Sequence, residues 1–366
     1  MSNQRDLVPA RVERMVPYKP GKPVEELERE LGIQGAVKLA SNENPYGAAP
    51  AVRAAVKEAL ENLGEYPDGA AFSLRSAVAS FNGVDASEVV TANGSNELID
   101  LICRTYPSAD DHVVFGKPSF VCYWLGCIAA GVDFTEVPLK DNLAWDVDAL
   151  LGAVTPATKV LFLANPNNPT GAHMGSADLE RLVRELPERV VLVVDEAYVE
   201  FADADDFVSA MTLRTLRKRM LILRTFSKAY GLASLRVGYA IGPSELIDYL
   251  HRMRAPFNVN RLGQLAAVEA LKAQDYLQSY VQENRSERRR VAAALEALNI
   301  PVAPSQTNFL LVNVERPGAE VYEELLREAV IVRPMPPPIQ TWLRITLGTP
   351  EQNDRMISAL QKVLAK

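Results

Sequence analysis

Lys228 has the most distinctive chemical setting of any residue in the chain. It follows an apolar run, Met220 to Leu223, and two small hydroxyl residues, Thr225 and Ser227. A lysine near the end of a buried strand is unusual, because an ammonium removed from water loses free energy unless it is paired or discharged. A lysine whose pKa is lowered in this way is a nucleophile suited to Schiff-base chemistry. Most lysines lie in solvated loops, so the rest of the sequence must distinguish the two cases.

Polar clusters follow two other apolar, strand-like runs. The run 160–164 leads into the Asn- and Pro-rich loop 165–171, and the run 190–194 leads into Asp195 and Glu196. In an open parallel sheet, ligands bind at the carboxyl ends of the strands. This repeated placement predicts an active site at that edge, with Asp195 and Lys228 close together.

A candidate anion site lies at Asn93-Gly-Ser-Asn96, directly before a helical pattern. Such residues commonly cap a helix, but the free N–H groups of a helix start also bind anions. An Asp after a short apolar strand also occurs as the magnesium carboxylate of P-loop nucleotide hydrolases. That class requires a G-x-x-x-x-G-K-[ST] loop, which this sequence lacks.

Composition narrows the class of protein. The 366 residues favour two domains, and 48% apolar with 23% charged residues is ordinary for a globular protein. A net charge of −7 argues against nucleic acid or an anionic membrane as partner. Cys103, Cys122 and Cys127 form no C-x-x-C pair and no zinc spacing, so we expect no metal, no disulfide framework and a cytoplasmic location. No signal peptide or run long enough to span a membrane is expected.

The order of the elements indicates the fold class. Between residues 85 and 241, apolar strand-like runs alternate with helical patterns, which predicts an α/β domain with a mostly parallel sheet flanked by helices. After residue 243 come three long helical patterns and then a smaller α+β unit. We expect a long helix at 274–298 to bridge the two. The predicted division is an N-terminal arm at 1–35, a large domain at 36–260 and a small domain at 261–366.

Five segments taken together resemble the class II aminotransferases of the fold type I, pyridoxal-phosphate-dependent group, and within it the histidinol-phosphate aminotransferase family. The resemblance runs from about residue 18 to the C-terminus. The segments are Ser41-Asn-Glu-Asn-Pro-Tyr-Gly47, Asn165-Pro-Asn-Asn-Pro-Thr-Gly171, Asp195-Glu-Ala-Tyr-Val-Glu-Phe201, Thr225-Phe-Ser-Lys228 with Arg236, and Leu343-Arg-Ile-Thr-Leu-Gly348.

This resemblance implies a pyridoxal 5'-phosphate cofactor bound as a Schiff base to Lys228, the residue that also shuttles the reacting proton. Asp195 is implied to keep the pyridine nitrogen protonated, and Tyr198 to act with Asn168 on the phenolic oxygen. Phe120 is implied to stack on the ring, where the family usually has Tyr. The implied phosphate site comprises Gly94, Ser95, Asn96, Thr225, Ser227, Arg236 and, from the partner subunit of a homodimer with shared active sites, Tyr66.

The implied reaction is ping-pong transfer of an amino group between glutamate/2-oxoglutarate and histidinol phosphate/imidazole-acetol phosphate, in histidine biosynthesis. The partners are thus a small amino donor and a 2-oxo acceptor. Arg344 is implied to hold the substrate's anionic group through bidentate contacts. The remaining residues implied to bind substrate are Tyr18, Asn44, Tyr66 and Arg333.

Two departures from the family leave the substrate open. The segment between Arg333 and Leu343 is Pro-rich and lacks the usual glycine, and Ser234 replaces a common glycine. An aromatic amino-acid aminotransferase is the main alternative, and a decarboxylase of an amino-acid phosphate is a more distant one. A non-catalytic binding module on the same fold is a third, although it would not need Lys228.

Overall fold

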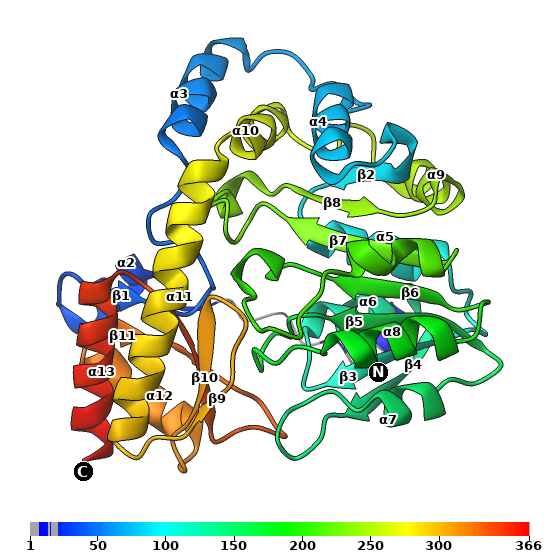
Figure 1. Cartoon of the computed structure of the whole chain (residues 1–366). Helices are drawn as coiled ribbons and strands as arrows, with labels where there is room; N and C mark the ends of the chain where they lie inside the picture. The colour runs from blue at the N-terminus through cyan, green and yellow to red at the C-terminus, as the bar shows by residue number, and fades with distance from the viewer. Residues whose placement is uncertain (1–6, 14, 16–20, 366) are drawn as a thin grey trace.

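The computed structural model describes residues 7–13, 15 and 21–365 of the chain. Figure 1 shows a large unit built around one sheet and a smaller unit beside it, with the long helix α11 (Gln274–Ala297) running along both. The last helix, α13 (Pro350–Leu364), lies on the outer side of the smaller unit.

A seven-stranded sheet forms the centre of the large unit, in the order β2-β8-β7-β6-β5-β3-β4. β3 to β7 are mutually parallel, as predicted from the alternating strand and helix patterns. The strands are β2 Val89–Ala92, β3 His112–Lys117, β4 Asp133–Pro138, β5 Thr158–Ala164, β6 Val191–Asp195, β7 Met220–Thr225 and β8 Gly238–Ile241.

Helices cover both faces of this sheet. Along β5, Val160 and Phe162 pack in the apolar cluster with α5, α6 and α9, whereas Leu161 and Leu163 pack in the cluster with α7 and α8. This alternation follows from the two-residue period of a strand and explains why its sequence is apolar throughout. The helices of the large unit are α3 Pro50–Ala59, α4 Phe72–Asn82, α5 Ser95–Thr105, α6 Val121–Ala130, α7 Val147–Gly152, α8 Ser176–Glu185, α9 Ser244–Met253 and α10 Arg261–Lys272. Its 3-10 turns are η2 Leu60–Asn62, η3 Ala86–Glu88, η4 Val199–Phe201, η5 Ala210–Leu216 and η6 Ala233–Leu235.

β8 runs antiparallel to both of its neighbours, β7 and β2. The alternating pattern did not reveal this reversal. Between β7 and β8 the chain makes only the short turn η6 and has no crossover helix. A parallel return needs such a crossover, so the strand comes back in the opposite direction. The loop that turns it around carries Lys228 and Arg236.

The smaller unit contains a four-stranded antiparallel sheet in the order β12-β13-β10-β9. A separate parallel pair joins β1 to β11, so a strand from the start of the chain docks on the smaller unit. The elements of the smaller unit are α2 Val24–Leu31, β1 Val37–Lys38, β9 Val302–Ala303, β10 Phe309–Asn313, α12 Gly318–Arg327, β11 Val330–Ile331, β12 Arg333–Pro334, β13 Trp342–Thr346 and α13 Pro350–Leu364. The short helix α1, Ala10–Glu13, instead contacts α6 of the large unit.

Helix α11, Gln274–Ala297, connects the two units, as predicted for residues 274–298. Its first half places Tyr280 and Val281 in an apolar cluster of the large unit, and its second half places Val291 and Leu295 in the core of the smaller unit. α10 packs with α3 and α4 of the large unit, although it lies beyond residue 260. The division of the chain into an arm at 1–35, a large domain at 36–260 and a small domain at 261–366 stays a prediction.

Within the described residues, the structure contains no helix of sufficient length and apolarity to span a membrane.

Candidate active site

A cavity of about 200 Å³ lies at the carboxyl edge of the large sheet, facing the smaller unit. β2, β3, β5, β6 and β7 all point toward this edge, so the loops that follow them converge. Twelve of the predicted site residues line the cavity: Ser95, Asn96, Phe120, Asn168, Asp195, Tyr198, Thr225, Ser227, Lys228, Arg236, Arg333 and Arg344. The structure thus brings together groups that are up to about 250 residues apart (344 − 95 = 249).

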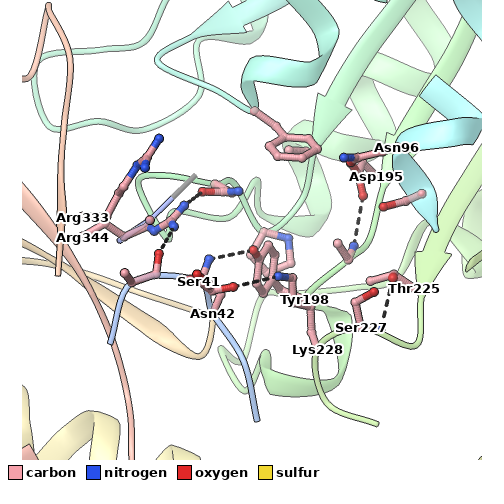
Figure 2. A pocket seen from close by; sticks show the side chains of 18 of the residues that line it. Ser41, Asn42, Asn96, Asp195, Tyr198, Thr225, Ser227, Lys228, Arg333 and Arg344 are labelled. Carbon is pink, nitrogen blue, oxygen red and sulfur yellow. Dashed lines mark hydrogen bonds between the residues drawn. The ribbon is translucent and has the colours of Figure 1, made fainter. Parts of the chain in front are cut away.

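Lys228 projects into the cavity from the loop after β7 (Figure 2). Its Nζ donates a hydrogen bond to the Ser41 carbonyl at 3.2 Å and lies 5.9 Å from the centre of the Tyr198 ring. Burial, with repulsion from Arg344 and Arg236, lowers the pKa of Lys228 to about 8. A lysine with this pKa has a substantial neutral fraction near physiological pH, as a nucleophile or a proton carrier requires.

Asp195 is buried at the end of β6, with 4% of its surface exposed. Its Oδ2 accepts a hydrogen bond from the Tyr123 hydroxyl at 2.9 Å, and its Oδ1 accepts one from the Ala197 N–H at 3.2 Å. Burial raises the pKa of Asp195 to about 6, and the Tyr123 hydrogen bond opposes that rise. A positively charged or proton-donating ligand in the cavity would therefore stabilise the ionised carboxylate.

Tyr123 was not identified from the sequence. Its signal was present but weak: it lies three residues after Phe120, the spacing that places two side chains on one face of a helix. Only the packing of α6 on the sheet brings its hydroxyl to Asp195. Asn42 was likewise not identified from the sequence. Its Nδ2 donates to the Tyr198 hydroxyl oxygen at 2.8 Å.

The expected phosphate site is formed by the first turn of α5 and by the loop between β7 and β8. Arg236 has a left-handed backbone (φ 56°), and its Nη1 donates to Ser227 Oγ at 3.3 Å. A Cβ at Gly94 would lie 2.6 Å from Arg236 Nη2, and one at Gly238 would lie 2.7 Å from the Ser95 nitrogen. The two glycines therefore allow a guanidinium and a helix start to approach one point, which suits the phosphate of pyridoxal phosphate.

On the opposite side of the cavity, Arg344 contacts residues from two other segments. Its Nη1 donates to Asn168 Oδ1 at 2.7 Å and its Nη2 donates to the Ala40 carbonyl at 2.8 Å. With its oxygen occupied by the guanidinium, Asn168 can offer its amide N–H groups to a ligand. This orientation agrees with the expected donation to a phenolic oxygen.

Arg333 and Arg344 lie directly opposite each other in the antiparallel pair of β12 and β13. Like charges at opposed positions repel, and both side chains line the cavity (Figure 2). Two guanidinium groups on one wall would suit an anionic ligand. Both arginines were predicted from the sequence, but their position as cross-strand neighbours was not.

A second cavity of about 430 Å³ extends from the first and shares Phe120, Asn168, Arg333 and Arg344 with it. Its other walls are mainly apolar. They include Phe115, Trp124, Met335, Pro336, Pro337, Pro338 and Ile339. The Pro-rich segment that departs from the family pattern thus forms a wall beside the two arginines.

Three predicted residues are not among those that line the first cavity. Asn44 is buried, and its Nδ2 donates to the Ala229 carbonyl at 3.0 Å. Within one chain it therefore holds the backbone of the residue that follows Lys228. Gly94 precedes the lining residue Ser95 and contributes by the close approach of Arg236. Tyr66 is 81% exposed and stacks on Phe257 with ring centres 4.8 Å apart. A fourth, Tyr18, lies outside the described residues.

The chain is similar to known proteins over nearly its whole length. Residues 34–360 match the family model for aminotransferases of classes I and II. Histidinol-phosphate aminotransferase 2 of Pseudomonas aeruginosa is 44% identical over 370 residues, covering 100% of both chains. Histidinol-phosphate aminotransferase of Halalkalibacterium halodurans is 40% identical, covering 96% of this chain and 95% of the relative. The histidinol-phosphate aminotransferase structure from Sinorhizobium meliloti, in complex with pyridoxal-5'-phosphate, has a TM-score of 0.90 and 27% identity, with 98% of each chain covered.

Proposed function

Because the chain belongs to the aminotransferases of classes I and II, we propose that it is a pyridoxal-phosphate-dependent transaminase acting on histidinol phosphate. The predicted family and fold class are confirmed by the matches in sequence and structure. The observation that carries the proposed chemistry is the single cavity that holds Lys228 and Asp195 on one side and two opposed arginines on the other.

The chemistry supplied by bound pyridoxal phosphate is an electron-withdrawing ring that stabilises negative charge on the neighbouring substrate carbon. In our proposal, Lys228 would hold the cofactor covalently through Nζ, and its amine would carry the proton to and from the substrate carbon. Asp195 keeps the ring nitrogen protonated, and Phe120 packs on the ring face. Ser95, Asn96, Thr225, Ser227 and Arg236 hold the phosphate.

The arginine pair explains how one site can serve two unlike substrates in turn. Glutamate carries carboxylates and histidinol phosphate carries a phosphate, so each has an anionic group for Arg333 and Arg344 to bind. Arg344 is positioned by Asn168 and by the Ala40 carbonyl, which presets its guanidinium for a planar, bidentate contact. Ping-pong transfer between glutamate/2-oxoglutarate and histidinol phosphate/imidazole-acetol phosphate requires this shared use, and places the enzyme in histidine biosynthesis.

The second cavity favours a second candidate activity, transamination of aromatic amino acids. Phe115, Trp124 and Ile339 give it an apolar lining next to the arginines, so a substrate could place its carboxylate on Arg344 and an aromatic ring in this space. We rank this below the first proposal because histidinol phosphate also fits the anion-binding wall and the relatives named above are histidinol-phosphate aminotransferases.

Single half-reactions separate the two activities. We expect histidinol phosphate to bleach the visible absorption of the cofactor bound to Lys228 about 100-fold faster than phenylalanine does, a ratio within the range that side-chain pockets achieve. Stopped-flow absorbance at matched subsaturating concentrations measures both rate constants, each amino substrate being mixed alone with the enzyme, and glutamate is measured separately as the reference amino donor. A faster reaction with phenylalanine would assign the enzyme to aromatic amino acids instead.

We also propose a homodimer in which Tyr66 completes the active site of the partner subunit. In one chain Tyr66 is not among the residues that line the cavity, and its side chain is exposed. Phe257, on which Tyr66 stacks, is also exposed, as are Leu63 and Phe72, which are near Tyr66 in the sequence. Large exposed apolar side chains gathered in one region favour a protein interface.

Mixing two inactive variants tests this shared site. Tyr66→Ala and Lys228→Ala carry their defects in different parts of the proposed composite site, so a mixed dimer retains one site with both residues intact. After denaturation and joint refolding in equal amounts, roughly a quarter of wild-type activity is expected, since half the dimers are mixed and each has one working site. Lys228→Ala refolded alone is the control. Mixed samples as inactive as that control, with dimers present, would rule out sharing through Tyr66.

The proposed location is the cytoplasm. Cys103, Cys122 and Cys127 are all free thiols in the structure, and free thiols are usual in a reducing compartment.

A further inference from the structure

Tyr123 contacts both residues that are proposed to hold the cofactor ring. It lies in the first turn of α6 and is fully buried. Its hydroxyl donates to Asp195 Oδ2 at 2.9 Å. Its ring meets the Phe120 ring edge to face, with centres 5.8 Å apart and planes at 89°. A single side chain therefore connects the residue proposed for the ring nitrogen with the residue proposed for the ring face.

We propose that Tyr123 is a positioning residue that holds the Asp195 carboxylate in its charged form and one orientation, and sets the Phe120 ring against the cofactor. This inference rests on the proposed function, because it requires pyridoxal phosphate in the cavity. Tyr123, which is not among the residues that line the cavity, would thereby influence the electronic state of the cofactor.

The Tyr123 hydroxyl can donate a hydrogen bond to Asp195 only while it keeps its own proton. Burial and the neighbouring Asp195 raise the pKa of Tyr123 well above its usual value, so the phenol stays protonated. A hydrogen bond donated to a carboxylate stabilises the charged form. It therefore offsets part of the burial that raises the pKa of Asp195 to about 6.

The proton shared between Asp195 and the ring nitrogen decides whether the cofactor can accept electrons. While the carboxylate is the weaker base, the proton stays on the ring nitrogen and the ring withdraws electrons strongly. Without the Tyr123 hydroxyl, the carboxylate becomes more basic and the proton moves toward it. The other titratable groups that act on this carboxyl and phenol are Cys122, Glu196, Tyr198 and Lys228.

The ring of Tyr123 is held as firmly as its hydroxyl. It stacks on Phe162 of β5 with centres 4.8 Å apart and planes at 13°, so it cannot turn without disturbing the sheet face. Phe120 is the N-cap residue of the same helix, and its carbonyl accepts the Tyr123 backbone N–H at 3.1 Å. Tyr123→Phe removes the hydroxyl alone, whereas Tyr123→Leu also removes the ring contact, so the two variants separate the two roles.

The test uses the holoenzyme reconstituted with pyridoxal phosphate labelled at the ring nitrogen for NMR. In Tyr123→Phe the nitrogen signal is expected to move toward the unprotonated position, while kcat falls about 10- to 100-fold, the size expected for losing a hydrogen bond to a charged group. KM for substrate is expected to change little. Tyr123→Leu is expected to show in addition a weaker cofactor affinity, measured by equilibrium dialysis.

Tyr106→Phe is the matched control. Its hydroxyl, on the same face of the sheet, donates at 2.9 Å to the Leu246 carbonyl rather than to Asp195. This variant is expected to lower the melting temperature without moving the nitrogen signal. Incorporating a ring-fluorinated tyrosine at position 123 strengthens the donor instead of deleting it, and is expected to move the signal toward the fully protonated position.

A nitrogen signal in Tyr123→Phe that matches wild type, or a fluorinated protein that shifts in the same direction as Tyr123→Phe, overturns the inference. These outcomes are distinct from failure of the proposed function. If wild type itself does not bind pyridoxal phosphate, the function is wrong. If wild type binds it with a protonated ring nitrogen and Tyr123→Phe is unchanged, the function stands and the role of Tyr123 is rejected.

Discussion

Lys228→Ala is expected to abolish transamination and to leave the purified protein without the visible absorption that the cofactor has when joined to the lysine. The alanine has no amine for covalent attachment and none to carry the proton, so kcat is expected to fall by about 10⁴-fold or more. Spectra of wild type and variant after cofactor addition, with steady-state rates, measure both effects. Lys218→Ala, which removes an exposed lysine outside the cavity, is the control. A colourless wild type after cofactor addition would refute the cofactor assignment.

The pH dependence of cofactor attachment follows from the setting of Lys228. Only the neutral amine attacks an aldehyde, and the pKa of Lys228 is about 8 instead of 10.5. Below pH 8 the rate of attachment to apoenzyme is expected to fall about tenfold per pH unit, and above it to level off. Stopped-flow absorbance on apoenzyme measures this profile. A rate that keeps rising to pH 10 would show that Lys228 is an ordinary, solvated lysine.

Asp195→Asn is expected to lower kcat by about 10²- to 10³-fold, the cost typical of removing one preorganised electrostatic partner. The amide occupies the same space and can still accept from Tyr123, but it cannot stabilise a protonated ring nitrogen. Steady-state kinetics measure the loss, and NMR of the labelled ring nitrogen is expected to report an unprotonated ring. Asp178→Asn, an exposed carboxylate in α8, controls for a general change of charge.

The apoenzyme of Asp195→Asn is expected to melt no lower than wild type at neutral pH. Burial raises the pKa of Asp195 from 3.8 to about 6, so the wild-type apoenzyme loses stability as the pH rises between these two values, and the whole loss is present at neutral pH. The neutral amide removes this cost. Loss of activity together with loss of stability would point to a structural role for Asp195 rather than a catalytic one.

The central sheet was predictable because local patterns specify it. A strand buried on both faces reads as a continuous apolar run, and 160–164 and 190–194 read in this way. Residues placed just after such strands must meet at one edge, so Asn168, Asp195 and Lys228 could be assigned to one site without coordinates. The resemblance to the aminotransferase family then predicted the role of each of these residues.

Relations between segments that are distant in sequence could not be predicted in the same way. The reversal of β8 depends on how the loop after Lys228 turns, and the strands on either side of that loop have the same apolar pattern whichever way they run. Arg333 and Arg344 are opposed only because β12 and β13 pair in one register. A shift of one residue would have placed the two side chains on opposite faces of the sheet.

The sequence by itself predicted the chemistry of this protein, because the lysine, the carboxylate and the helix start proposed to bind an anion are each marked by residue type and by their place at the end of an element. Tertiary structure decided what surrounds them: the Tyr123 hydroxyl on Asp195, the Asn42 amide on Tyr198, and the apolar cavity behind the arginines. These contacts depend on side-chain directions across the sheet and between the two units, which are set by packing and leave no periodic pattern in the sequence.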